Sequence, residues 1–285
     1  MKRLALIFAL ILAAACGKSW QPEGEETLVI EGWIDEGKYP VVMVTTSVPT
    51  ETGYQAIDDQ KSHLGRWARV EVSDGETSVL LTGMTDENYF PSYIYTCTSV
   101  SGYIKGEVGK TYTLKVDLNG YHATASTTIP ESVPLDTIEV TPSADNPGKY
   151  SLKGSFSNPE GSERYYRMFV RTEGEDDSYV PSFMGCMEGK NLGNPAIVDI
   201  MKGQSVFNDS GWEWNPALFN PGDKVHVRFC NMDRASFDFW KSFEKIAALS
   251  RVPLFPVTYN PPYNIQGGIG CWCGYGASEY TIEIK

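Results

Sequence analysis

The segment NIQGGIGCWCGYG, at residues 264–276, combines the residue types from which a phosphate cradle or a metal site could be built. A dinucleotide cradle needs the spacing G-x-G-x-x-G directly after a strand and at the start of a helix, so that backbone amides meet the phosphates. Here Gly268 and Gly270 are followed by three other residues before Gly274, so the spacing fails. The glycines instead predict a bend in which backbone packs against backbone.

The two thiols of the same segment could in principle bind a soft metal ion. Cys271 and Cys273 would project from one face of an extended strand, but a structural zinc site needs about four ligands. The other cysteines and the histidines are scattered singly, at Cys97, Cys186, Cys230, His63, His122 and His226. The sequence therefore predicts neither a metal site nor a cofactor. The two thiols are either free or joined by a long-range disulfide to Cys186 or Cys230, because connectivity cannot be deduced from sequence.

Motifs of the common hydrolases are missing from the sequence: it has no G-x-S-x-G, no H-E-x-x-H and no P-loop. In the strand KVHVRFC, His226 shares a face with Arg228 and Cys230, so a Cys-His pairing is conceivable. The simpler interpretation is favoured, in which these three form the polar side of a half-buried strand. The core side would then consist of Val225, Val227 and Phe229.

Carboxylates are concentrated in the stretch EGEDD at residues 173–177, which lacks the D-x-[DN]-x-[DN]-G pattern of a calcium loop and is expected to be a solvated loop. The seven tryptophans and 16 tyrosines could provide a stacking surface for sugars or peptides. Within DSGWEWNP, Trp212 and Trp214 are the candidate ligand-binding residues. No catalytic residue can be assigned from the sequence.

The first 20 residues, MKRLALIFALILAAACGKSW, have the organisation of a secretory signal peptide. Residues 1–15 carry two basic side chains, an apolar run too short to span a bilayer, and three alanines before Cys16. Small residues directly before a cysteine resemble the lipobox of bacterial lipoproteins, so Cys16 is the predicted lipid anchor to the membrane. The alternative is an ordinary secreted protein cleaved near Ala15. Residues 16–26 then form the lipidated cysteine and a polar, flexible tether.

Charge restricts the partners of the mature chain. Without Lys2 and Arg3 the chain has 22 basic and 36 acidic residues, a net charge of −14. Such a surface repels nucleic acid, so no nucleic-acid partner is expected. Five cysteines remain beyond Cys16, and an odd number in an oxidising compartment leaves at least one thiol free or paired outside the chain.

Strand patterns dominate the chain after the tether. Short β-branched runs with a period of two fill residues 27–130, and TYTLKVDLNGYHATAS shows the clearest alternation, with Asn119 and Gly120 as a two-residue hairpin turn. Prolines at 130 and 134 interrupt the pattern, so residues 131–136 are the predicted linker. Strands resume in residues 137–285. The fold class is therefore all-β, with two β-sandwich-like domains.

One amphipathic helix is expected in the second domain, at about residues 234–249. Its start is indicated by Asp233 as N-cap. An apolar stripe with steps of three and four residues should pack on the sheet, and it comprises Phe237, Trp240, Phe243 and Ala247.

The chain as a whole resembles the Bacteroidota outer-membrane lipoprotein family known as domain of unknown function 4249. The resemblance is carried by LVIEGWIDEGKYPVVMVTTSVP, ARVEVSDG, GEVGKTYTLKV, NPGDKVHVRFCNMDRASFDFWKSF and NPPYNIQGGIGCWCGYGAS. It implies a surface lipoprotein whose first domain is immunoglobulin-like and whose second is β-rich. It also implies an association with TonB-dependent transporters of the SusC type and their SusD-type partners. It supplies no catalytic residue, and its members more often have aliphatic or aromatic residues at positions 271 and 273.

Three functions are compatible with this sequence. The first is an accessory binding lipoprotein of a TonB-dependent nutrient-uptake system, which holds a peptide, a glycan or the transporter with loops of its second domain. The second is a surface hydrolase acting on a glycan or peptide, and the third is a structural or adhesive lipoprotein. The lack of a catalytic motif favours binding over catalysis. The expected location is the outer membrane, lipid-anchored and exposed at the cell surface, although a periplasm-facing orientation is the alternative.

Overall fold

The structure, a computed structural model, describes residues 27–47, 63–89, 91–159, 161, 163–203, 215–250 and 261–285. The predicted signal peptide, Cys16, the tether, and Trp212 and Trp214 lie outside these ranges. Strands form most of the described chain, together with one long helix, as the sequence predicts. No helix within the described ranges is both long enough and apolar enough to cross a membrane.

The first half of the chain is a β-sandwich with immunoglobulin topology. One sheet has the strand order β1-β2-β6-β5 and the other β8-β7-β3-β4, which is the A-B-E-D and G-F-C-C′ arrangement of that fold. The strands are β1 (Leu28–Asp35), β2 (Val41–Thr46), β3 (Arg69–Ser73), β4 (Ser78–Leu80), β5 (Thr82–Thr85), β6 (Tyr93–Thr96), β7 (Thr111–Leu118) and β8 (Tyr121–Thr128). The immunoglobulin-like prediction is thus confirmed.

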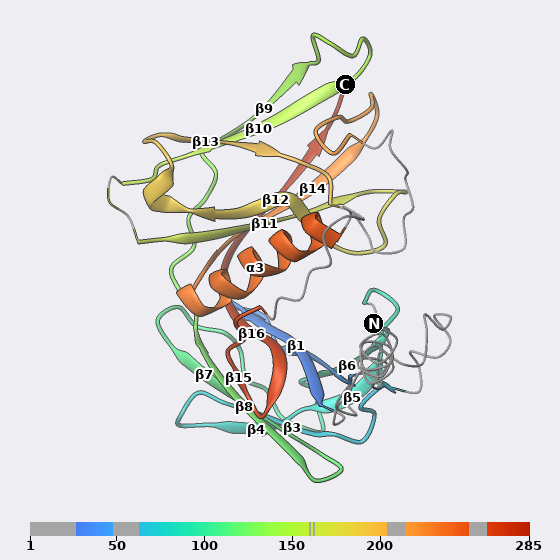
Figure 1. The fold of residues 1–285 in the computed structure, drawn as a ribbon, viewed down its shortest axis with the longest axis vertical. Coiled ribbons are helices and arrows are strands. Elements are labelled where there is room, and N and C mark those ends of the chain that lie inside the picture. Colours follow the sequence, from blue (N-terminus) through green and yellow to red (C-terminus); the bar gives the residue numbers. More distant parts are fainter. Residues whose placement is uncertain are drawn as a thin grey trace, which may run out of the picture.

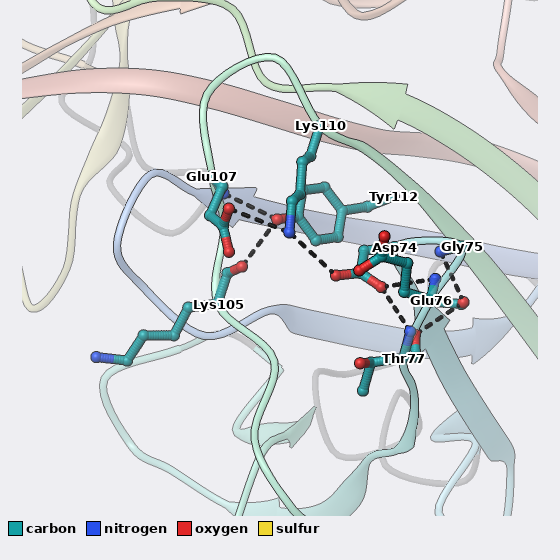
Figure 2. Close-up of polar contacts among 9 residues, drawn as sticks. Asp74, Gly75, Glu76, Thr77, Lys105, Glu107, Lys110 and Tyr112 are labelled. Atoms are coloured by element: carbon teal, nitrogen blue, oxygen red, sulfur yellow. Dashed lines mark hydrogen bonds and ion pairs between the residues drawn. The ribbon is translucent and has the colours of Figure 1, made fainter.

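A tyrosine corner supports the same assignment, because immunoglobulin-like domains carry a tyrosine near the start of strand F that bonds the backbone a few residues upstream. Tyr112, near the start of β7, donates its hydroxyl to the carbonyl of Lys105 and accepts the amide of Glu107, both at 2.8 Å (Figure 2). Beside it, the Lys110 ammonium lies 3.1 Å from Glu107 and 3.5 Å from Asp74. These contacts tie the β6–β7 loop to the β3–β4 turn.

The hairpin between β7 and β8 has the turn that the sequence predicts. Asn119 and Gly120 both have positive φ, at 50° and 87°, as a type I′ turn requires. The side chains of β7 alternate between core and solvent. Local turn chemistry and the period of two therefore fix the register of these strands.

A second sandwich is formed by the later strands. Its helix-bearing sheet contains β12, β11, β14 and the last part of β16, and its other sheet has the order β13-β10-β9. Their bounds are β9 (Thr137–Pro142), β10 (Tyr150–Phe156), β11 (Tyr165–Thr172), β12 (Val180–Glu188), β13 (Ala196–Ile200), β14 (Lys224–Met232) and β16 (Gly268–Glu283), with a 3-10 turn η3 (Gly189–Asn191). Phe156, Tyr166 and Phe229 pack against one another at the centre of the core between these sheets.

The last strand joins one sheet of each sandwich into a single eight-stranded sheet, and Figure 1 shows β1 and β16 side by side below α3. Residues 268–275 of β16 pair in parallel with β1, and residues 276–283 pair antiparallel with β14. The short strand β15 (Ile265–Gln266) pairs with β8. The division into residues 27–130 and 137–285 does not anticipate that residues 265–275 belong to the first sandwich, whose core includes Ile265 and Trp272.

Helix α3 (Arg234–Ser250) covers the outer face of the eight-stranded sheet, on β11, β12 and β16 (Figure 1). Its bounds and its N-cap agree with the prediction, since the Asp233 carboxylate accepts the Ser236 amide at 2.8 Å. Phe237 and Trp240 are buried as expected, but Phe243 is 44% exposed. The prediction that Phe243 packs on the sheet is therefore wrong. The neighbouring Glu244 faces the sheet instead, where its carboxylate pairs with Arg167.

Candidate functional site

Beneath α3 the sheet carries a buried stack of cations and aromatic rings. The guanidinium of Arg167 lies 4.9 Å from the ring centroid of Trp240 and 5.6 Å from that of Phe169. The Arg228 guanidinium also lies 5.1 Å from the ring centroid of Phe169, and 5.2 Å from that of Tyr275. Such cation–π contacts gain strength when they are desolvated. The stack occupies the position at which α3, β11, β14 and β16 meet.

Each guanidinium of the stack has one carboxylate partner from a distant part of the chain. Arg167 pairs with Glu244 of α3, which also accepts the Cys186 amide at 3.0 Å. Arg228 pairs with Asp35 at the end of β1. The cluster is closed to solvent and its charges are matched, so it joins the helix and the first sandwich to the second sheet rather than forming a reaction centre.

The strand KVHVRFC is buried on both faces. Val225, Val227 and Phe229 lie in the core as predicted. The opposite face is also covered, because α3 and its stack bury Arg228 and Cys230. The imidazole of His226 bonds Glu173 through Nε2 at 2.7 Å and the Thr281 hydroxyl through Nδ1 at 3.0 Å. The imidazole is therefore not paired with Cys230. The prediction that one face of this strand is polar and exposed is wrong for Arg228 and Cys230, because α3 covers that face.

In this structure no disulfide joins any of the five described cysteines. Cys186 and Cys230 both face Arg167, on the two strands that flank β11. Two strand spacings put their Cα atoms roughly 9.6 Å apart, beyond the reach of about 7 Å for a disulfide. Burial raises the pKa of each thiol to about 12, so both are protonated at neutral pH. The long-range disulfide from Cys271 or Cys273 to Cys186 or Cys230, which the sequence left open, is also not formed.

The carboxylates of residues 173–177 are mostly taken up by local partners. Glu175 lies 2.7 Å from the Lys202 ammonium, and Asp176 accepts the Thr172 amide at 2.8 Å. Burial raises the pKa of Asp176. Within the ranges that the structure describes, no group of three or more His, Cys, Asp or Glu side chains could hold a metal ion.

The glycines of the last strands allow the close backbone approach that the sequence predicts. Gly270 has a φ of 117°, and a Cβ there would lie 1.9 Å from the Ile30 carbonyl oxygen. At Gly276 a Cβ would lie 2.2 Å from the Pro130 carbonyl oxygen. These positions exclude any larger residue. The glycines of this segment therefore allow the strands to pack closely, and they do not form a phosphate-binding loop.

Two shallow depressions, of about 310 and 220 Å³, lie on the described surface. The larger has a floor of hydroxyl and amide side chains from β7, β8 and β15. The smaller lies between the linker and Arg164. In neither does a thiol or an imidazole face a carboxylate. The depressions therefore hold neither a Cys-His nor a Ser-His pair, although Glu131 and Asp136 both line the smaller one.

A tryptophan is displayed on the surface of the first sandwich. Trp67 is 91% exposed and lies in the turn of residues 64–68, between β2 and β3, which we call the Trp67 turn. The turn is anchored to β6 by two tyrosine hydroxyls. Tyr95 accepts the Ala68 amide at 2.9 Å and donates to the Gly65 carbonyl, and Tyr93 donates to the Arg66 carbonyl at 3.1 Å.

Two glycines make room for this anchoring. A Cβ at Gly83 would lie 2.4 Å from the Tyr93 hydroxyl. At Gly65 a Cβ would lie 2.8 Å from Val44 Cγ1, and the Gly65 amide donates to the Val44 carbonyl at 2.8 Å. Burial raises the pKa of Tyr95 to about 12, so its hydroxyl keeps the proton that it donates. The Trp67 turn is therefore held in place by backbone and side-chain bonds.

The surroundings of Trp67 resemble an interface in composition. The alternation of β3 puts Arg69 and Glu71 on the outer face, and Leu80, opposite Glu71 in β4, shares that face and is 47% exposed. Trp67 precedes β3 by two residues, in the turn. Arg69 pairs with Glu71 at 2.7 Å and with Asp117 at 3.7 Å. We call Trp67, Arg69, Glu71 and Leu80 the Trp67 face. Its apolar side chains have a charged rim, as interfaces do.

Sequence reasoning pointed to Trp212 and Trp214, which lie outside the described residues, and it missed Trp67. A signal for it exists in GRWARVEVS. There the apolar residues 68, 70 and 72 alternate with residues 67, 69 and 71, so the period of two assigns the indole to the same solvent face as Arg69 and Glu71.

Comparison with known proteins gives one family. A family profile described as "Domain of unknown function (DUF4249)" matches residues 20–281. No curated protein matches the chain. Among solved structures, "Cytokine receptor complex - Crystal form 1A" is similar over 88% of this chain and 94% of that chain, with 9% sequence identity and a TM-score of 0.26.

Proposed function

The chain belongs to the family of domain of unknown function 4249, and from this premise we propose that it is a lipid-anchored binding protein of the bacterial outer membrane. In this proposal Cys16 carries the lipid, and the folded body is an accessory component of a TonB-dependent nutrient-uptake system with SusC- and SusD-type partners. The first 16 residues support the anchor, because they have the organisation of a signal peptide and end in a lipobox-like cysteine. The expected orientation is toward the cell surface.

The observation that carries the binding role is the Trp67 turn. An indole that is 91% exposed gains nothing from folding, yet four hydrogen bonds and two glycines hold its turn in one position. Tryptophan is the residue type most enriched among interface residues with large binding energies, and a rigid one loses little entropy on binding. The Trp67 turn is therefore built for contact with a partner.

The composition of the Trp67 face favours a protein as that partner. Trp67 and Leu80 supply apolar area, while Arg69 and Glu71 supply charges at its edge. The neighbouring edge strand β4 has only three residues, which is too short for a partner to add a strand by backbone pairing. Recognition would then rest on side chains. We assign this face to the transporter complex and leave nutrient contacts to other loops.

The test is capture from mildly solubilised native membranes, with the tagged full-length protein as bait and mass spectrometry of the captured proteins. We expect a SusC- and SusD-type pair in amounts close to that of the bait. Trp67→Ala should reduce the captured pair at least about tenfold, because loss of a central interface tryptophan costs roughly 2 kcal/mol or more. Recovery of the bait alone from wild type would contradict the proposal.

Two further variants make the capture specific. Trp67→Phe keeps an aromatic ring on the same turn and should recover part of the captured pair. Ile197→Ala removes an exposed apolar side chain from the second sandwich and should capture as much as wild type. All three variants should unfold at the same urea concentration as wild type, because exposed side chains contribute little to stability.

The anchor is tested separately by metabolic labelling with palmitate. Wild type should incorporate label and Cys16→Ala should not, because the lipidated thiol is absent. As a control, Cys97→Ala removes a buried thiol of the first sandwich and should label fully. Equal labelling of the wild-type and Cys16→Ala proteins would show that Cys16 is not the acylated residue.

A further inference from the structure

The thiols of Cys271 and Cys273 form a pair that neither the fold nor the proposed binding role explains. Both lie on β16 under α3, and each is 1% exposed. Their Sγ atoms are 2.9 Å apart. Unbonded carbon atoms settle at about 3.5–4.0 Å, and sulfur is larger than carbon, so two free thiols are crowded at this distance.

A bond between the two sulfurs requires the strand to bend locally. Residues two apart in a strand have Cα atoms roughly 6.6 Å apart, at the upper end of the range of about 4.4–6.8 Å seen for disulfides, and their parallel side chains must tilt together until the Cβ atoms are about 3.8 Å apart. The other thiols of this buried cluster, Cys186 and Cys230, are the cross-strand neighbours of Arg167. On β16, Cys230 is opposite Ala277, which is four residues beyond Cys273. Each of the two paired thiols therefore has the other as its nearest partner. We propose that Cys271 and Cys273 form an intrachain disulfide in the mature protein.

The reaction is a thiol–disulfide exchange with an oxidising protein disulfide. One thiolate of the pair attacks a sulfur of the oxidant, which releases a thiolate of the oxidant and leaves a mixed disulfide. The second thiolate of the pair attacks that bond, forms the S–S bond between residues 271 and 273, and releases the reduced oxidant. Two protons and two electrons leave the pair in total. Because α3 buries both sulfurs, the exchange must precede the packing of Phe237 and Trp240.

This inference rests on the proposed extracytoplasmic location, since disulfides form in oxidising compartments. The test uses the protein isolated from its native membranes. It is denatured in the presence of iodoacetamide, which alkylates free thiols, before any reduction, and is then digested with trypsin. Residues 252–285 form one tryptic peptide that contains only these two cysteines. We expect this peptide without alkyl groups and about 2 Da lighter than its dithiol form. After reduction it should take up two alkyl groups.

The remaining thiols are internal controls, because each lies on its own tryptic peptide, at residues 70–105, 172–190 and 229–234. Cys97, Cys186 and Cys230 should be alkylated before reduction. In Cys273→Ser, the 252–285 peptide should carry one alkyl group before reduction. Two alkyl groups on the wild-type peptide before reduction, or a cross-link to another peptide, would overturn the proposal.

A second preparation separates the geometry from the location. Here the protein is unfolded, reduced, and refolded with reduced and oxidised glutathione, and it should again yield the unalkylated 252–285 peptide. If the bond forms on refolding but is absent from native membranes, the inference fails for the mature protein together with the proposed location. If it forms in neither preparation, the geometry is wrong and the proposed binding role is unaffected.

Discussion

A fragment that ends at residue 136 is expected not to fold into a stable sandwich, although it contains all eight strands of the immunoglobulin topology. The reason is that part of its core comes from the C-terminus. Trp272 is fully buried in the first core, and its indole nitrogen donates to the Tyr112 carbonyl at 2.9 Å. Ile265 lies in the same core. Without these residues the core has a cavity and β1 has an unpaired edge.

The size of the effect follows from Trp272 alone. Removing a buried tryptophan side chain costs about 3–5 kcal/mol, against a total stability of about 5–15 kcal/mol for a domain. Trp272→Ala in the full chain should therefore lower the urea midpoint strongly. For the fragment of residues 27–136, which loses the whole segment, we expect no cooperative transition by circular dichroism or tryptophan fluorescence.

A longer fragment provides the control for the short one. Residues 261–276, joined to the end of residues 27–136 by a flexible linker, restore Ile265, Trp272 and the partner of β1. This longer fragment should unfold cooperatively. The expectation would be contradicted by a cooperative transition in the short fragment whose midpoint matches that of the long one. The result also determines whether the tandem of two sandwiches can be divided at the linker.

The parts of the fold that could be predicted are those whose signals are local. The alternation of β7, the turn at Asn119 and Gly120, and the N-cap at Asp233 each depend on a few adjacent residues, and the structure has all three. The pairing of β16 with β1 joins residues about 240 positions apart. A period of two shows that a strand exists but not which strand lies beside it.

The candidate site shows the same division. Exposure of Trp67 follows from the period of two around it, but the tyrosine hydroxyls that hold its turn come from β6. The helical stripe predicted Phe243 in the core, whereas the buried Arg167 requires a carboxylate and Glu244 takes the inward position. A buried charge on a distant strand thus overrode the amphipathic pattern, because an unpaired guanidinium costs more than one exposed ring.

Asp35→Ala is the second change with a large expected effect. Asp35 is 3% exposed and its partner Arg228 7%, and the ion pair links β1 to β14. Removing one partner of a buried pair costs about 3–5 kcal/mol, because the remaining charge stays desolvated. The Nε of Arg228 already has no hydrogen-bond partner in the described part of the chain, and loss of Asp35 removes the carboxylate with which the guanidinium pairs. Urea unfolding of the full chain measures the loss.

Two comparisons separate the uncompensated charge from lost packing. Arg69→Ala breaks the exposed pair with Glu71, and it should cost less than about 1 kcal/mol. The double variant Asp35→Leu/Arg228→Met removes both charges and keeps apolar volume beside Phe169 and Tyr275, so it should be markedly more stable than Asp35→Ala alone. If the double variant is as unstable as the single one, the loss comes from the contacts that Asp35 and Arg228 make and not from an uncompensated charge.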